Sequence, residues 1–428
     1  MGSSASKKKT PKPRGFDPPP APPREYPREY RLKGWPALTS ELYVDPEVGS
    51  ARNDGSKEKP FDTIMNALKV AGDNTAIYLA AGVYRNHRFG SGDVGNPAVA
   101  TVQNVNNILL TAVDGARPRI EFDGAGGISA RNVTYLEVCG VEIVGPGESI
   151  TKAEAMADRT NHSPMYSGRG ICVWSGSRIH IHHNTVSFCP NSGIRINKGD
   201  HCCIESNEVH SCCWWSSNAE SAVVIAEAHA VDASDDVKMV IRANRVHGNM
   251  NKIPYYNAHY DDPQYMADHQ MHVARKNYGS SQQTFIIDGS GVYITRNSST
   301  YSHGQFLLAD NVAFENGING LVVHKTDRVL VKNNVLFENG KVSKKKPQSR
   351  QPYAGLVVTH SQSVTLSNNR VRAPSGDFAY TLTGGSTLAD GAAAGAATNH
   401  VVRGEVSPAL AACVSKMRWR DFGEWGGC

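Results

Sequence analysis

The chain has 428 residues, of which 40 are glycine, and its formal net charge at pH 7 is +5. Residues 1–34 hold nine basic and three acidic side chains, so the rest of the chain carries 36 basic and 37 acidic side chains and is close to neutral. That balance argues against a general nucleic-acid-binding surface on the body of the protein. No apolar run is as long as a membrane span, and no apolar signal-peptide core follows Met1, so we expect an intracellular or membrane-tethered protein rather than a secreted one.

Residues 1–40 are predicted to be a disordered tail that is basic and rich in proline. Eight prolines between Pro11 and Pro27 favour an extended linker. The start, MGSSASKKK, fits the pattern M-G-x-x-x-[ST], which predicts N-myristoylation at Gly2 beside a polybasic patch, and hence a membrane surface as partner. The alternatives are a solubilising tail and a remnant of an expression vector.

Residues 41–90 are typical of a cap on the first coil of a solenoid. Phe61, Ile64, Leu68 and Ala71 recur at helical spacing, and the stretch TAIYLAAGVYR then reads as a strand and a turn. Because a helix over the open end protects a solenoid's first coil, we expect a capping helix here.

Two phrases recur along the middle of the chain. The first is φ-x-φ-x-x-[ND]-x-V, where φ is apolar; its markers are Val186 and Val209, Val312 and Val335 (each pair 23 residues apart), and also Val246, Val371 and, more loosely, Ile143. The second is Gly-φ-x-φ, which starts at Gly170, Gly193, Gly291, Gly320 and Gly355. Such a period with strand-like alternation predicts an all-β protein, a parallel β-helix whose stacked coils share one core. The asparagines are expected to form a ladder at one corner, where they would also adopt the left-handed backbone that a corner needs.

The stretch from Leu42 to Arg85, LYVDPEVGSARNDGSKEKPFDTIMNALKVAGDNTAIYLAAGVYR, resembles the opening of right-handed parallel β-helix proteins of the pectate-lyase-like superfamily. Together with the coils, the resemblance covers residues 41–373, and it implies the handedness and the architecture. It implies carbohydrate chemistry only weakly, because β-helices also serve as epimerases, adhesins and viral spikes. The stretch GIRINKGDHCCIESNEVHSCCWWSSNAES is also similar to β-helix repeat proteins of undefined activity. Residues 374–428 are expected to form a C-terminal extension or exit cap.

The number of cysteines, nine, is odd and argues against a fully paired secreted framework. Cys189 and Cys212 each follow a marker valine by three residues, so they should lie on adjacent coils. Either a disulfide or a ladder of free thiols fits that spacing, and a reducing compartment favours the thiols.

Four insertions interrupt the repeat, at residues 145–169, 214–221, 251–283 and 341–353. Each follows the Asn-x-Val strand and precedes the Gly-φ-x-φ strand. We therefore expect all four to leave the solenoid at one corner and to form a wall along one side, where binding sites usually lie.

The Gly-φ-x-φ strands should form the floor beside that wall. The side chains predicted to point outward are Cys172, Trp174, Arg195, Asn197, Tyr293, Thr295, Val322, His324 and Thr359, with Lys198, Arg296 and Lys325 one residue beyond. Rings stack on sugar faces and forked donors hold hydroxyl or carboxylate groups, so this floor suits an oligosaccharide.

The leading hypothesis is a carbohydrate-active protein, a lyase that cleaves an acidic polysaccharide by β-elimination, which needs a cation at the carboxylate and a base near C5. The catalytic candidates are Arg195, Lys198, His324, Lys325 and Lys252, and the substrate-binding candidates are Trp174, Asn197, Tyr293, Arg296, Trp214 and Trp215. Ca²⁺ is the candidate cofactor, with Asp288, Asp235 and Asp236 as ligands beside Glu227 and Asp232. Trp214 and Trp215 serve equally well as anchors of their loop.

Several alternatives stay open. A non-catalytic glycan-binding or virion β-helix fits the same pattern, as does a tethered scaffold if Gly2 is acylated. A carboxylate pair for glycoside hydrolysis cannot be read from the sequence. His180 and His182 alternate with isoleucines, face outward and are interpreted as structural. The protein is expected to be a monomer, and Arg195→Ala is expected to leave the melting temperature nearly unchanged because that side chain points outward.

Overall fold

The computed structural model describes residues 34–257, 264, 286–342, 353–373, 378–388 and 400–402. The predicted tail up to residue 33, including Gly2, lies outside the described residues, so acylation stays a prediction. None of the described helices is long and apolar enough to cross a membrane.

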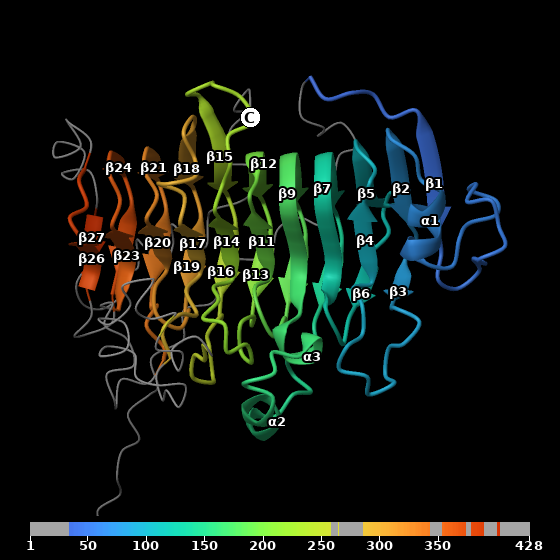
Figure 1. The fold of residues 1–428 in the computed structure, drawn as a ribbon, viewed down its shortest axis with the longest axis horizontal. Coiled ribbons are helices and arrows are strands. Elements are labelled where there is room, and N and C mark those ends of the chain that lie inside the picture. The colour runs from blue at the N-terminus through green and yellow to red at the C-terminus, as the bar shows by residue number, and fades with distance from the viewer. Residues whose placement is uncertain are drawn as a thin grey trace, which may run out of the picture.

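The described chain forms a parallel β-helix with three faces, and the strands follow chain order from one end to the other (Figure 1). Face 1 contains the Gly-φ-x-φ strands together with the strands that stack in line with them. Its members are β4 (Ala100–Gln103), the first parts of β7 (Gly126–Cys139) and β9 (Arg169–His182), β11 (Ile194–Asn197), β14 (Val223–Ala226), β17 (Val292–Thr295), β20 (Leu321–His324), β23 (Ala354–Thr359) and β26 (Phe378–Thr383).

Face 2 is joined to face 1 through the long strands β7 and β9. It contains β1 (Ser40–Val44), β2 (Thr75–Leu79), β5 (Ile108–Ala112), the second parts of β7 and β9, β12 (Asp200–Glu205), β15 (Val237–Arg242), β18 (Gln305–Ala309), β21 (Val329–Lys332) and β24 (Val364–Ser367).

Face 3 is a separate sheet of short strands. It contains β3 (Gly82–Tyr84), β6 (Pro118–Glu121), β8 (Glu142–Val144), β10 (Thr185–Ser187), β13 (Glu208–His210), β16 (Arg245–His247), β19 (Val312–Phe314), β22 (Val335–Phe337), β25 (Arg370–Arg372) and β27 (His400–Val402). Because β26 and β27 pair with β23 and β25, strands of the solenoid continue beyond residue 373, where the repeat is no longer readable in the sequence.

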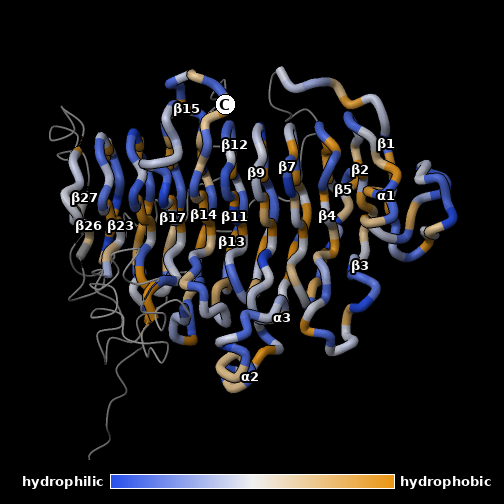
Figure 2. The backbone as a smooth tube through the Cα atoms, viewed as in Figure 1, coloured by the Kyte–Doolittle hydropathy of each residue, from blue (hydrophilic) through white to orange (hydrophobic). Residues whose placement is uncertain are grey.

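Alternate side chains of each strand build one continuous core. In β11, Ile194 and Ile196 are fully buried, and Ile194 stacks in register on Ile171 in β9 and on Val223 in β14. Apolar residues recur in this way along the strands, with hydrophilic residues between them (Figure 2). Helix α1 (Ile64–Val70) begins at the N-cap Thr63 and places Ile64 in this core at the N-terminal end, as predicted for a cap.

The glycines that open the face 1 strands mark a close approach between faces. A Cβ atom on Gly193 would lie 2.4 Å from Cγ1 of Val209, and one on Gly355 would lie 2.1 Å from Cγ1 of Val371. Face 3 packs so tightly against these positions that no side chain fits, which explains the recurring Gly-φ-x-φ phrase.

The predicted asparagine ladder lies at the corner between faces 2 and 3, here called the asparagine corner. Six buried residues form it: Asn184, Asn207, Asn244, Asn311, Asn334 and Asn369, and each side-chain amide donates to the next side-chain oxygen at 2.9–3.1 Å. One detail of the prediction is wrong. The left-handed residue is the one before each asparagine, for example Ser206 (φ 54°) and Ala243 (φ 54°), because the asparagine side chain must point inward along the ladder.

The register predicted from the valine markers is wrong by one residue on two coils. Val246 pairs with Ala313, not Val312, and Val371 pairs with Leu336, not Val335. Ala313 and Leu336 lie in the core, whereas Val312 and Val335 form a small outer cluster with Phe314 and Phe337. On these coils, the residue that points into the core is the one two positions after the asparagine. The position of the asparagine, and not that of the valine, therefore determines the register.

Cys189 and Cys212 lie on adjacent coils, as predicted, and both are buried free thiols. The backbone N–H of Cys213 donates to the carbonyl of Cys189 at 2.9 Å, which joins the two coils at this point. Because the Cys189 and Cys212 thiols are both free, the structure agrees with the ladder of thiols rather than with a disulfide. Burial raises the pKa of the Cys189 thiol.

Candidate functional site

The four insertions all leave the solenoid at the corner between faces 3 and 1, here called the loop corner, as predicted. They connect β8 to β9, β13 to β14, β16 to β17 and β22 to β23, and the first of them carries α2 (Lys152–Ala157) and α3 (Pro164–Ser167). Much of the third and fourth lies outside the described residues.

Three of these insertions contact one another and form a wall. The guanidinium of Arg159 donates to the carbonyl of Tyr255 at 2.6 Å, and the hydroxyl of Ser217 donates to the carbonyl of Arg159 at 2.9 Å. The indole of Trp215 donates to the carbonyl of Gly147 at 2.6 Å. The wall is therefore a single packed structure rather than a set of separate loops.

Two predicted sugar-stacking residues belong to the interior of this wall. Trp215 is only 8% exposed and packs with Ile150 and Ile253, so it anchors its loop and does not present a ring to a ligand. Trp214 is half-buried, and its indole donates to the carbonyl of Gly248. The ammonium of Lys252 lies 2.9 Å from the centroid of the Trp214 ring, and burial lowers the pKa of Lys252 to about 8.

At the foot of the wall, a buried ionic group joins it to the floor. Glu220, from the wall, is 6% exposed and forms ion pairs with Arg195 of β11 and, at 3.1 Å, with Arg169 of β9. Burial alone would raise the pKa of Glu220, but the two guanidinium groups and a hydrogen bond from Ser192 outweigh it and lower the pKa. The Glu220 carboxylate holds the Arg195 guanidinium at the foot of the wall, which gives Arg195 a positioning role in this geometry.

Asp288 lies next to this group and has the opposite character. It is 9% exposed, accepts hydrogen bonds from the hydroxyl of Ser221 and from the backbone N–H of Gly289, and precedes β17. Burial, with a smaller contribution from the charge of Glu220, raises the pKa of Asp288 to about 6. Two neighbouring carboxyl groups whose pKa values are pushed apart are typical of an acid–base pair.

Further along the floor, Tyr293 and His324 form a second polar group. The hydroxyl of Tyr293 lies 3.0 Å from Nδ1 of His324, and the hydroxyl of Thr295 lies 2.9 Å from the same nitrogen. Burial, together with the positive charge of Lys325 and the neighbouring His360, lowers the pKa of His324 to about 4. The imidazole is therefore uncharged at neutral pH.

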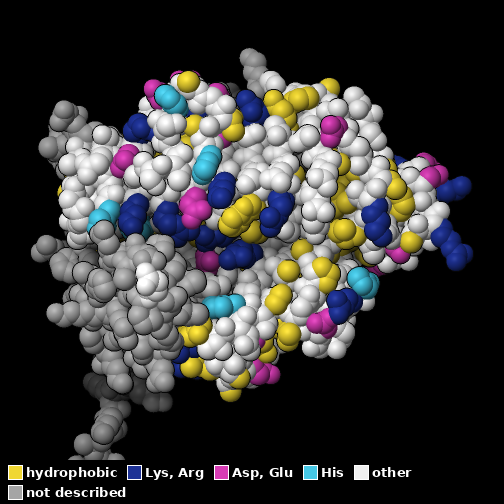
Figure 3. Space-filling model, in the orientation of Figure 1, with side chains coloured by type: hydrophobic (Ala, Val, Ile, Leu, Met, Phe, Trp, Pro, Cys, Tyr) yellow, Lys and Arg dark blue, Asp and Glu magenta, His cyan; other side chains and the backbone are white. Residues whose placement is uncertain are grey.

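The corner between faces 1 and 2, here called the charged corner, carries one outward residue from each coil. In stacking order these are Lys198, Glu227, Arg296, Lys325 and His360, and each has a left-handed backbone with φ between 46° and 57°. Each backbone N–H bonds to the coil that follows, for example Arg296 to the carbonyl of His324. Arg296 donates to Glu227 at 2.9 Å, and Arg296, Lys325 and His360 are exposed. Basic side chains gather across the middle of this side of the molecule (Figure 3).

The structure thus brings together most of the predicted floor, with different exposures. Trp174 is 38% exposed, and the ammonium of Lys198 lies 5.7 Å from its ring centroid. By contrast, Asn197 is 2% exposed and accepts from the Arg195 guanidinium at 3.0 Å, so it braces Arg195 instead of facing a sugar. Thr295, Val322 and Thr359 point outward in register but are also buried. Arg169 and Glu220 are not among the predicted site residues, because nothing in their local sequence shows that the wall folds back onto the floor.

The proposed Ca²⁺ ligands do not come together. Asp288 lies at the loop corner, whereas Asp235 and Asp236 precede β15, where Asp235 accepts from Gly304 and Asp236 from Ser234. Asp232 forms an ion pair with Lys238 at 2.8 Å. Within the described residues, no group of three ligating side chains includes Asp288, Asp235 or Asp236, so Ca²⁺ binding stays a prediction.

A cavity of about 560 Å³ opens elsewhere, toward the N-terminal end of the loop corner. Apolar side chains including Phe89, Phe122 and Met165 line it, with carboxylates such as Glu121 and Asp123. Glu121 forms ion pairs with two arginines, and Asp123 accepts from the backbone of Gly90. Because these carboxylates hold their own loops, we place the candidate site at the floor instead.

Comparison with known proteins supports the fold directly. The family described as the right handed beta helix region matches residues 169–391, slightly more than half of the chain. No curated protein matches the chain.

Solved structures with similarity include a pectate lyase (15% identity, TM-score 0.43, covering 83% of this chain and 81% of that one) and the A-module of a mannuronan C-5 epimerase from Azotobacter vinelandii (12%, 0.42, 84% and 88%). A structure described as a glycoside hydrolase is 8% identical, with a TM-score of 0.48 and coverage of 90% and 100%. On the family match and the pairing of its own strands, the chain belongs to the right-handed β-helix family.

Proposed function

We propose that the protein is a carbohydrate-active enzyme that binds an acidic polysaccharide along the charged corner and cleaves it by β-elimination. The observation that carries the proposal is the 3.0 Å contact between the Tyr293 hydroxyl and Nδ1 of His324, beside cations at equivalent positions of the coils. A proton-transfer pair next to fixed positive charge is what the removal of a proton beside a carboxylate needs.

The charged corner supplies the electrostatic part of this chemistry. Lys198, Arg296 and Lys325 would bind the uronate carboxylates, and their charge would stabilise the negative charge that develops when the C5 proton leaves. Trp174, the exposed ring beside Lys198, would stack on a sugar face. The wall would confine the polymer to one side of the floor.

Tyr293 and His324 would move the protons. The phenol oxygen of Tyr293 takes the C5 proton while its own proton passes to Nδ1 of His324; the electron pair forms the C4–C5 double bond, and the C4–O bond breaks. The imidazolium returns its proton through Tyr293 to the leaving oxygen, which restores both groups. The low pKa of His324 favours this return step and makes the preceding acceptance of the Tyr293 proton the more demanding one.

The test is a panel of uronans, with and without Ca²⁺, read by the ultraviolet absorbance of unsaturated ends. One polymer should give product, and Tyr293→Phe and His324→Gln should each lower turnover by about 10²–10⁴-fold. Tyr78→Phe is the matched control. Tyr78 lies in β2 on face 2, far from Tyr293 in the sequence, so this variant should retain full turnover. Binding of a polymer without any product would contradict the proposal that the protein is an enzyme, and it would favour the non-catalytic glycan-binding alternative.

Glycoside hydrolysis is a second candidate, favoured by the opposed pKa shifts of Asp288 and Glu220. Asp288 would be the general acid, and ionised Glu220 would stabilise positive charge or activate water. The same panel distinguishes the two reactions, because hydrolysis gives reducing ends without unsaturation. In that case Asp288→Asn, and not Tyr293→Phe, should abolish turnover.

A further inference from the structure

Far from the loop wall, metal-ligating side chains gather on the outer side of face 2. Register places His180 of β9 between Glu137 of β7 and Cys203 of β12, and it places His182 beside Glu205. Their strand neighbours, such as Ile179 and Ile181, point into the core, so these side chains point outward as predicted for the histidines. All five are nevertheless at most 1% exposed.

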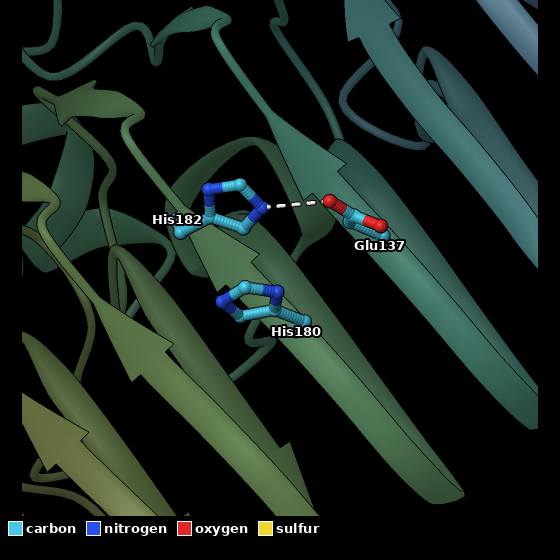
Figure 4. A group of neighbouring side chains, drawn as sticks. All are labelled: Glu137, His180 and His182. Carbon is cyan, nitrogen blue, oxygen red and sulfur yellow. Dashed lines mark hydrogen bonds and ion pairs between the residues drawn. The ribbon is translucent and has the colours of Figure 1, made fainter. Parts of the chain in front are cut away.

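The side chains converge on one point. One ring nitrogen of His180, one of His182 and a carboxylate oxygen of Glu137 all lie within 4.8 Å of one another. Nε2 of His182 is 2.9 Å from the Glu137 carboxylate, and the two imidazole rings stack with centroids 3.8 Å apart (Figure 4). The ring of Trp35 covers this group, with its centroid 6.4 Å from that of His180.

Each histidine is also oriented by a second partner. Nδ1 of His182 lies 2.9 Å from Nδ1 of His183. Nε2 of His180 lies 2.8 Å from the carboxylate of Glu205, which is itself held by the guanidinium of Arg242. A carboxylate or other acceptor behind the ligating histidine is the arrangement that orients histidines in metal sites.

We propose that Glu137, His180 and His182 form a binding site for a divalent transition-metal ion such as zinc, with Glu205 and His183 as the outer partners. Two imidazoles and one carboxylate suit zinc and its neighbours in the first transition row, whereas calcium and magnesium take oxygen ligands. Bound there, the ion would join β7 to β9 beneath Trp35 and stabilise the N-terminal coils. The proposal does not depend on the polysaccharide chemistry.

A second histidine pair provides a matched control within the same chain. His210 and His247 stack on face 3 with centroids 5.1 Å apart, and His247 lies 3.2 Å from Glu208. These residues share the side-chain types, but within the described part of the chain they do not appear among the convergent groups of ligating atoms.

The experiment uses the full-length protein, unfolded in chelator and refolded with or without zinc, because a buried site must be filled as the chain folds. We expect one zinc ion per chain by elemental analysis, a higher melting temperature in the zinc-refolded sample, and visible absorption bands when cobalt replaces zinc. Glu137→Gln and His182→Gln should lose the stoichiometric metal, and Glu205→Gln should weaken affinity by about 10- to 100-fold. His210→Gln should keep the metal.

Absence of stoichiometric zinc from folded wild-type protein under both conditions would overturn the proposal and leave a hydrogen-bonded network. Equal metal loss in His210→Gln, or unchanged binding in both ligand variants, would also overturn it. Because a variant that fails to fold loses metal trivially, far-ultraviolet circular dichroism is recorded on every sample, and the wild-type measurement decides alone if a ligand variant is unfolded.

Discussion

Two corners of the same solenoid have opposite characters. At the asparagine corner the residue is the same on six coils, and five amide-to-amide hydrogen bonds of 2.9–3.1 Å join them in a buried column. At the charged corner every coil has the same left-handed backbone, but the side chain varies among lysine, glutamate, arginine and histidine. Three of the five side chains, those of Arg296, Lys325 and His360, are exposed.

The difference shows which part of a coil is constrained by stacking. A buried amide needs an identical partner above and below, so the asparagine recurs. An exposed left-handed corner needs only the backbone bond to the next coil, and it holds non-glycine residues at a cost of about 1 kcal/mol each. The charged corner is therefore free to carry side chains selected for something other than the fold.

The comparison is tested most strongly by Asn207→Ala. Asn207 accepts from Asn184 and donates to Asn244 and to the carbonyl of Ile181, so truncation leaves several buried polar groups unsatisfied. We expect the free energy of unfolding to fall by about 3 kcal/mol. Chemical denaturation measures it, and an unchanged midpoint would show that the column is not what holds the coils together.

Asp288, at the loop corner, tests whether a buried carboxyl group there lowers the stability of the fold when it ionises. Its folded pKa of about 6 lies above the ordinary value, so its contribution to stability is fully present below the unfolded pKa and is lost as the pH rises through 6. The loss amounts to about 3 kcal/mol for a shift of this size. Unfolding curves at pH 4 to 7 should show this decline in the wild type relative to Asp288→Asn, and parallel pH profiles would contradict it.

Arg195→Gln sharpens the comparison, because the outward direction of the Arg195 side chain alone predicts no change in melting temperature. The structure places the guanidinium against buried Glu220, which would keep Arg169 and Ser192 as partners within the described residues. We expect a loss of about 2 kcal/mol, less than for a buried charge left with no partner. Arg296→Gln is the matched control, because its pair with Glu227 is exposed and should contribute less than about 1 kcal/mol.

The smallest effect on stability is expected for Lys325→Ala. Lys325 is exposed on the charged corner, so the free energy of unfolding should change by less than about 0.5 kcal/mol. The affinity of the variant protein for an acidic polysaccharide should still fall below that of the wild type. The difference in affinity should be smaller at high salt, where charges are screened. Binding measured at two ionic strengths checks this. A variant with a clearly lower free energy of unfolding would instead show that the charged corner stabilises the fold.

The sequence predicted the features that repeat. The 23-residue spacing indicated coils, the recurring asparagine indicated a ladder, and the unequal spacings indicated the loop corner. The predicted register was wrong by one residue at Val312 and Val335, where two apolar neighbours both fit the pattern and only strand pairing shows that Ala313 faces the core. Strands β26 and β27 continue the solenoid into the predicted C-terminal extension.

Features that occur once were decided only by the tertiary structure. The pairing of Arg169 with Glu220 joins residues 51 apart, and the convergence of Glu137 and His182 joins residues 45 apart on neighbouring coils. The burial of Trp215 depends on an insertion packing back onto another insertion. Periodic stacking leaves its mark in every coil and can be read locally, whereas an ion pair, a covered ring or a metal-ligating group depends on distances between segments that no local pattern records.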